Sequence, residues 1–232
     1  MKHLGVIGGL GPMATACFME LVTEMTDVKT DQEHIPMTIL SRPSIPDRTA
    51  YILGGSTVSP LPMMIEAGRT LAAMGAELIA IPCMTAHCFH EELVSQLPVP
   101  VVHAVRETAL EMKKRGVKRA GLMATAGTVK STIFQRELNV VGVDCVLPSR
   151  ETQEIITDII YTQVKAGRAV SLDMLCGCAT ALMSSGAECV ILGCTELSVV
   201  KRHCPLGFDV VDAMEVLASR SVEACGVPLK LI

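Results

Sequence analysis

The sequence contains few aromatic residues, with no Trp, two Tyr and four Phe among 232 residues. It also has no block of basic residues, and its formal net charge is −4. Surfaces that bind nucleic acid usually combine clustered Lys and Arg with aromatic side chains that stack on bases. Nucleic acid and anionic membrane surfaces are therefore poor candidates for partners, and we expect a small-molecule ligand.

Long apolar runs are also missing, because none approaches the roughly 20 residues that a membrane-spanning helix needs. The first nine residues hold one basic residue and a four-residue apolar stretch, which is too short for the apolar region of a signal peptide. We expect a soluble cytoplasmic protein with no membrane partner. In that compartment the ten cysteines are expected to be reduced thiols and not a disulfide framework.

Half of the residues are hydrophobic and 19% are charged, a composition typical of a compact globular protein. The length allows one large domain or two domains of about a hundred residues each. The order of apolar runs, turns and helical spacings along the chain indicates alternating strands and helices.

A pair of cysteines occupies equivalent positions in two repeated stretches. A Gly-Ala-Glu triplet at residues 75–77 is followed by an apolar run and then by Cys83. A second triplet at residues 186–188 is followed by another apolar run and then by Cys194. Each apolar run is interpreted as a buried strand with its cysteine at the carboxyl end.

Other stretches repeat in the same order. Residues 117–125 resemble residues 1–9, and residues 210–213 resemble residues 101–104, each expected to include a short strand. The chain is therefore interpreted as α/β, with two similar three-layer α/β/α domains whose parallel sheets are related by a pseudo-twofold axis. Ligands of such sheets bind beyond the carboxyl ends of the strands, so the two cysteines are expected to face each other across an active-site cleft between the domains.

Two opposed thiols suit a reaction that removes a proton from one face of a carbon and returns a proton to the other face. Racemisation of an α-amino acid is such a reaction, with Cys83 and Cys194 as the catalytic acid/base pair. Helix ends or hydrogen-bond donors nearby would have to make each thiol partly thiolate. No lysine motif indicates pyridoxal phosphate, so we expect chemistry without a cofactor.

Two other stretches resemble a nucleotide-binding turn and a metal site. The turn after the first strand, residues 8–13, contains Gly-x-Gly but lacks the third glycine of a dinucleotide fingerprint, and Pro12 removes a backbone donor. Such a turn still offers backbone N–H groups to a small carboxylate.

Cys83, His87, Cys88 and His90 could ligate a metal, but no standard zinc spacing is present and the second half lacks the histidines, so no metal site is predicted.

Six motifs together resemble the aspartate/glutamate racemase family, with the closest similarity to cofactor-independent aspartate racemases. They lie at residues 8–12, 45–49, 82–87, 124–128, 164–167 and 193–196. The resemblance implies an amino-acid substrate, with Cys83 and Cys194 as acid and base. It also implies substrate contacts for the residues Met13, Arg48, Met84, Thr85, Thr128, Lys165 and Thr195.

Within that set, Arg48 and Lys165 are expected to meet the carboxylates of a dicarboxylic substrate, aspartate first and glutamate second. The same resemblance implies a homodimer and a last helix that packs back on the first domain. The first domain is then residues 1–103 plus 212–232, and the second is residues 104–211.

The chain departs from the family pattern at two places. Met84 stands where the family usually has Asn, and a thioether cannot donate a hydrogen bond. Ser41 and Arg42 replace an Asn pair before the arginine loop. These changes leave the exact substrate open. Alternatives are a two-cysteine enzyme of the maleate isomerase or hydantoin racemase type, or a carboxylate-binding protein that kept the fold with weak catalysis.

Overall fold

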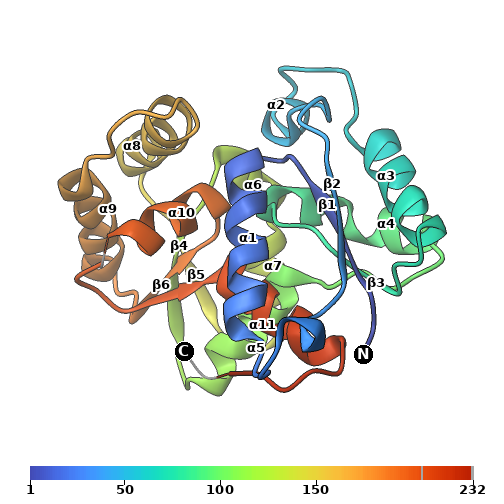
Figure 1. Cartoon of the computed structure of the whole chain (residues 1–232). Helices are drawn as coiled ribbons and strands as arrows, with labels where there is room; N and C mark the ends of the chain where they lie inside the picture. The colour runs from blue at the N-terminus through green and yellow to red at the C-terminus, as the bar shows by residue number, and fades with distance from the viewer. Residues whose placement is uncertain (205, 231–232) are drawn as a thin grey trace.

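The computed structural model describes residues 1–204 and 206–230 and contains two parallel β-sheets (Figure 1). The first sheet has the order β2-β1-β3, formed by Met37–Ser41, Leu4–Gly8 and Leu78–Ala80. The second has the order β5-β4-β6-β7, formed by Asp144–Val146, Arg119–Met123, Cys189–Leu192 and Val210–Asp212. The predicted α/β fold class with parallel sheets is confirmed.

Helices alternate with these strands. Their bounds are α1 Pro12–Met25, α2 Arg48–Ile52, α3 Leu61–Ala73, α4 His90–Gln96, α5 Ala104–Lys114, α6 Ala126–Ser131, α7 Ile133–Val140, α8 Arg150–Asp158, α9 Leu172–Ser184, α10 Thr195–His203 and α11 Ala213–Ala224. Short 3₁₀ helices cover Asp31–Glu33 and Met84–Phe89, and a π-helical turn covers Ile159–Val164.

The sequence repeat corresponds to a repeated packing contact. Gly5 in β1 faces Ala76, and a Cβ added to Gly5 would lie 2.8 Å from the Ala76 Cβ. Gly121 in β4 faces Ala187 in the same way, at 3.1 Å. The central strand of each sheet thus carries a glycine because the alanine of the Gly-Ala-Glu triplet packs directly on it.

The first and last residues of each triplet also have matching roles. The two glycines adopt left-handed backbone conformations, with φ of +95° and +93°, which end the preceding helices. Glu77 accepts a hydrogen bond from the backbone N–H of His3 at 3.1 Å, and Glu188 accepts one from that of Lys118 at 2.8 Å. The triplet therefore fixes the start of each buried strand against the central strand of its sheet.

The halves differ at their last strand. Residues 210–212 form β7, whereas the strand expected near residues 101–104 is reduced to a single parallel bridge between Val101 and Ile79. Pro100 has no N–H to extend the ladder. His103 then caps α5 by accepting a hydrogen bond from the backbone N–H of Arg106 at 3.1 Å, so the chain leaves the sheet at once.

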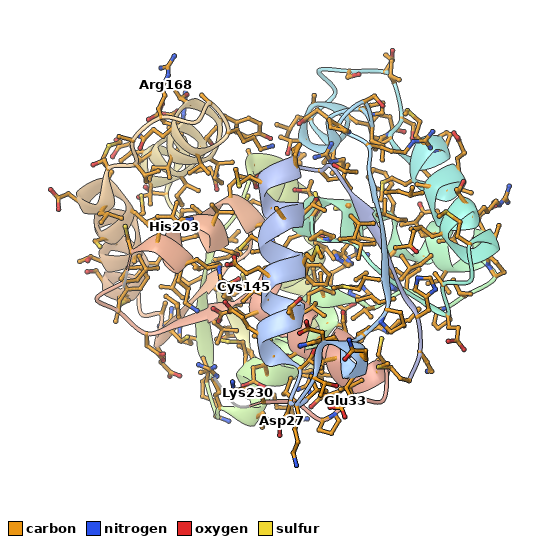
Figure 2. The ribbon with its side chains drawn as sticks, in the orientation of Figure 1. Asp27, Glu33, Cys145, Arg168, His203 and Lys230 are labelled. Carbon is orange, nitrogen blue, oxygen red and sulfur yellow. The ribbon has the colours of Figure 1, made fainter. Side chains whose placement is uncertain are left out.

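The C-terminal segment returns to the first half. In Figure 1, α1 stands between α8–α10 on one side and α2–α4 on the other, and α11 packs against α1 and α5. Figure 2 shows Lys230 beside Asp27 at the lower end of α1. The Lys230 N–H donates to the carbonyl of Met25 at 2.7 Å, and the Asp27 N–H donates to that of Pro228 at 3.0 Å. The apolar core runs across both halves, and the division at residues 103/104 and 211/212 stays a prediction.

No helix in the part of the chain that the structure describes is both long and apolar enough to cross a membrane. All ten cysteines are free thiols in the structure.

Candidate active site

Cys83 and Cys194 occupy the same structural position in the two halves. Each has an extended backbone, with φ of −158° for Cys83 and −142° for Cys194, and each directly precedes a helix. Cys83 precedes the 3₁₀ helix Met84–Phe89, and Cys194 precedes α10. The N-terminal end of a helix carries partial positive charge, so each cysteine lies beside such a charge.

Both cysteines line one small cavity, which we call the inner chamber. Its volume is about 10 Å³, enough for about one water molecule. Side chains from both halves surround it, namely Leu10, Asp47, Arg48, Thr49, Cys83, Met84, Thr85, Thr125, Tyr161, Lys165, Cys194, Thr195 and Glu196. The structure therefore brings together most of the residues that the sequence pointed to, and it shows them in a closed arrangement.

A larger cavity of about 370 Å³ adjoins the inner chamber, and we call it the outer chamber. Its lining includes the turn before α1, the Arg48 loop, Lys165 and the first turns of α10. Leu10, Asp47, Arg48, Lys165 and Glu196 line both chambers and so stand between them. The helices α1 and α10 both begin here, and their N-terminal ends favour an anionic ligand.

Arg48 is buried in the wall that the chambers share, with 7% of its surface exposed. Its Nη2 donates to the carbonyl of Leu10 at 2.7 Å, and its Nη1 donates to those of Ile45 and Pro46 at 3.3 and 3.1 Å. Burial lowers the pKa of Arg48, but the adjacent Cys83, Asp47 and Glu196 together raise it, so the net pKa is raised. The structure thus fixes a permanent positive charge beside Cys83.

Lys165 reaches the site from the π-helical turn Ile159–Val164. Its Nζ lies 4.4 Å from the centre of the Tyr161 ring and 3.9 Å from Oε1 of Glu196. Burial lowers the pKa of Lys165, but the Glu196 carboxylate and further anionic groups raise it overall. Turns of π-helix occur often at functional sites, and this one directs both Tyr161 and Lys165 at the inner chamber.

Glu196 contacts the second cysteine directly. The Cys194 thiol donates to Oε2 of Glu196 at 3.0 Å, and the Thr195 hydroxyl donates to the same oxygen at 3.4 Å. Burial and the Glu196 carboxylate raise the pKa of Cys194 well above its ordinary value. Glu196 belongs to the sequence motif at residues 193–196, which by itself indicates no role for it. Its spacing, two residues after the cysteine at the start of a helix, was the available signal.

The predicted threonines divide into two groups. Thr85 and Thr195 line the inner chamber, whereas Thr128 is fully buried behind it. The hydroxyls of Thr85, Thr125 and Thr128 form a triangle with separations of 2.8 to 3.1 Å. Thr125, which was not among the predicted substrate contacts, takes the lining position.

The two predicted methionines also lie at the site, but in different surroundings. Met13 lines the outer chamber and is 68% exposed. Met84 lines the inner chamber and is only 2% exposed. The thioether beside Cys83 is therefore part of the wall nearest the two thiols.

Histidines near Cys83 form their own cluster. Nε2 of His87 lies 3.2 Å from the carbonyl of Ile81, and the rings of His90 and His103 lie 4.1 Å apart between centroids. Across residues 1–204 and 206–230, no group of three His, Cys, Asp or Glu side chains is arranged to hold a metal ion.

A family model described as Asp/Glu/Hydantoin racemase matches residues 7–220. The chain belongs to this family. The aspartate racemase of Picrophilus torridus is 29% identical, with a TM-score of 0.85 over 99% of this chain and 96% of that one. An aspartate racemase homologue from Pyrococcus horikoshii is 26% identical, with a TM-score of 0.78 over 97% and 99% of the two chains.

Among curated proteins, the broad specificity amino-acid racemase RacX of Bacillus subtilis is 26% identical over 223 residues, which cover 94% of this chain and 96% of that protein. The family and these relatives support amino-acid racemisation as the activity.

Proposed function

We propose that the protein racemises an α-amino acid without a cofactor, using Cys83 and Cys194 as the two proton carriers. The observation that carries this proposal is that both thiols line one closed chamber, each at the start of a helix. One thiolate takes the α-proton and leaves a planar carbanion. The other thiol then donates its proton to the opposite face.

The proposed substrate is an acidic amino acid, with aspartate first and glutamate second. Arg48 and Lys165 both line the two chambers, and each supplies a positive charge that a carboxylate can meet. The N-terminal ends of α1 and α10 add backbone partial positive charge on the same side. Thr85 and Thr195 supply hydroxyl groups at the inner chamber.

A broader substrate range is a second candidate, favoured by Met84. This buried side chain offers the substrate an apolar contact and no hydrogen bond. The outer chamber of about 370 Å³ also has room for a side chain longer than that of aspartate. A panel of acidic, neutral and basic amino acids distinguishes the two candidates.

Substrate entry requires the halves to move apart. The inner chamber of about 10 Å³ is too small for an α-carbon with its substituents. The two halves meet there through side-chain contacts such as the bond between the Thr85 and Thr128 hydroxyls, which opening would break. The closed arrangement then excludes water from the carbanion.

The experiment is exchange of the substrate α-hydrogen in D₂O, followed by NMR or mass spectrometry across the amino-acid panel. Incorporation of deuterium into both enantiomers of aspartate supports the proposal. Absence of exchange with every amino acid would rule it out. A covalent adduct after treatment with maleate would instead indicate chemistry of the maleate isomerase type, with one cysteine as nucleophile.

The proposal includes a homodimer in the cytoplasm, as the resemblance to aspartate racemases implies. Light scattering coupled to size-exclusion chromatography measures the mass directly. A mass near 24.7 kDa, that of a single chain, would contradict the dimer.

A further inference from the structure

The helices that follow the two cysteines begin in the same way. In each half, the N–H of the third residue after the cysteine donates to the cysteine carbonyl, at 3.1 Å for Cys83 and 3.0 Å for Cys194. The next residue in each helix is polar and buried, namely His87 in the first half and Ser198 in the second. His87 and Ser198 are therefore equivalent in the repeat, because each lies four positions after its cysteine.

Ser198 is bonded to the end of the last strand of the second sheet. Its hydroxyl donates to Oδ1 of Asp212 at 2.6 Å, and both side chains are buried; we call this the Ser–Asp contact. Asp212 ends β7 and pairs with Leu192, which precedes Cys194 by two residues. The same Oδ1 accepts the Met214 N–H at 2.9 Å and so caps α11. One buried carboxylate therefore joins the start of α10 to both β7 and α11.

The first half has an equivalent contact made by different side chains. Residues 101–104 correspond to residues 210–213 in the repeat, so His103 is the counterpart of Asp212. His103 likewise caps the helix that follows it. The rings of His87 and His103 stack with their centroids 5.6 Å apart and their planes at 27°, and we call this the His–His contact. In both halves, the residue four positions after the cysteine thus meets the capping residue of the next helix in the repeat.

His87 is also connected to the backbone of Cys83. Nε2 of His87 lies 3.2 Å from the carbonyl oxygen of Ile81, and the Cys83 N–H donates to the same oxygen at 2.7 Å. Because a carbonyl only accepts, Nε2 carries the hydrogen atom. None of the four side chains in the His–His and Ser–Asp contacts lines the inner or the outer chamber. They can influence the reaction only through the segments that carry the cysteines.

We propose that the His–His contact positions Cys83 and that the Ser–Asp contact positions Cys194, an inference that rests on the two-thiol racemisation proposed above. Each contact fixes the helix behind one sulfur atom against the end of a strand. Proton transfer between sulfur and carbon requires this precision, because a misplacement of about 1 Å can slow an enzymatic step by about 100-fold. Since each contact belongs to one sheet, each controls proton transfer at one face of the substrate carbon.

The test compares Ser198→Ala with the unaltered protein by α-hydrogen exchange in D₂O, started from each pure enantiomer of the best substrate. The variants Cys83→Ser and Cys194→Ser identify which enantiomer each thiol deprotonates. With Ser198→Ala, exchange of the Cys194 enantiomer should slow by ~10-fold, and exchange of the Cys83 enantiomer should change by less than about 3-fold. Racemisation slows in both directions, with kcat lowered by ~10-fold and KM changed by less than about 3-fold.

The corresponding test in the first half uses His87→Leu, which removes the ring and its N–H donor. This variant should slow exchange of the Cys83 enantiomer by ~10-fold and spare the other enantiomer. Two conservative variants should recover part of the lost rate. His87→Gln keeps an N–H that can donate to the Ile81 carbonyl, and Asp212→Asn keeps an oxygen that accepts the Ser198 hydroxyl. A merely structural role would not separate the two enantiomers.

The control is Ser221→Ala in α11, because this buried hydroxyl donates only within its own helix, to the Leu217 carbonyl at 2.7 Å. Its exchange rates should match those of the unaltered protein, and circular dichroism checks that every variant is folded.

Unchanged exchange in Ser198→Ala, or equal slowing of both enantiomers, would overturn the positioning role. Slowing of the same enantiomer by Ser198→Ala and His87→Leu would overturn it as well. Failure of the unaltered protein to exchange any amino acid would contradict the proposed function itself, and that result is separate from any effect of these variants.

Discussion

The hydroxyl groups of Thr85 and Thr128 lie 2.8 Å apart, and this contact joins the Cys83 segment of the first half to α6 of the second. Both side chains are buried, and Thr125 completes the network from the turn before α6. Because a buried hydroxyl that loses its partner is costly, the network favours the arrangement in which the halves are closed.

Replacing Thr128 with Val keeps the side-chain shape and removes its hydroxyl. We expect the free energy of unfolding to fall by ~1 kcal/mol, because Thr85 loses one partner. KM should stay nearly unchanged, since Thr128 does not line either chamber. Thr108→Val is the control, because its buried hydroxyl bonds only its own helix, to the Ala104 carbonyl at 2.8 Å. A large rise in KM for Thr128→Val would show instead that the hydroxyl meets the substrate.

Gly127 lies in α6, where this helix packs against α2. A Cβ at this position would lie 2.7 Å from the backbone Cα of Thr49, which belongs to the opposite half. Gly127→Ala should therefore hold the halves apart and lower kcat/KM by at least ~10-fold, since closure completes the site. Gly177→Ala in α9 is the control, because nothing lies within 4 Å of the added Cβ. That control should gain about 0.5–1 kcal/mol of stability from better helix propensity. Unaltered kinetics of Gly127→Ala would contradict the packing argument.

Arg48→Lys tests whether the guanidinium geometry matters beyond its charge. Lysine keeps the positive charge but cannot donate to the carbonyls of Leu10, Ile45 and Pro46 together. We expect kcat/KM to fall by ~100-fold, as for other misplaced positioning groups. Arg42→Lys is the matched control, because Arg42 pairs with Glu66 at 2.9 Å and lines neither chamber. Equal kinetics for the two variants would show that charge alone is sufficient at residue 48.

The histidine cluster predicts sensitivity to acid. Burial and the neighbouring histidines lower the pKa of His87 from 6.5 to about 3, and burial together with His90 lowers that of His103 to about 4. Below pH 6.5 the unfolded chain therefore binds more protons than the folded one. The contribution to stability is present above pH 6.5 and is lost as the pH falls towards these folded-state values.

His103→Asn removes one of these titrating groups and keeps an acceptor at the start of α5, where Asn is a favourable cap. Arg106 and Glu137, the other charged neighbours of His103, are unchanged in this variant. The midpoint of acid unfolding, followed by circular dichroism, should move to lower pH by roughly half a pH unit. A midpoint that stays in place would show that His103 does not limit acid stability.

The fold was predictable because its determinants are local in sequence. Each Gly-Ala-Glu triplet ends a helix, packs an alanine on a strand glycine and bonds a strand backbone, so the same residues recur in both halves. The cysteines follow the buried strands for the same reason. Helix boundaries were harder to predict: Thr132 adopts a left-handed conformation, with φ of +60°, and separates α6 from α7.

The side-chain contacts between segments that are distant in the sequence could not be predicted, because they depend on how those segments pack together. Nothing in the order of residues shows that Thr125 lines the inner chamber while Thr128 supports it from behind. The pairing of Lys165 with Glu196 likewise arises only when the π-helical turn and α10 meet. Both depend on side-chain directions that a spacing pattern does not contain.

The central claim is that Cys83 and Cys194 act on opposite faces of one substrate carbon. Its most direct test is α-hydrogen exchange in D₂O with Cys83→Ser and Cys194→Ser, each started from the pure L and the pure D enantiomer of the best substrate. Both variants should lose racemisation, and each should retain exchange of one enantiomer only, with the opposite enantiomer for the other variant. Retained racemisation in either variant, or retained exchange of the same enantiomer in both, would contradict the two-thiol mechanism.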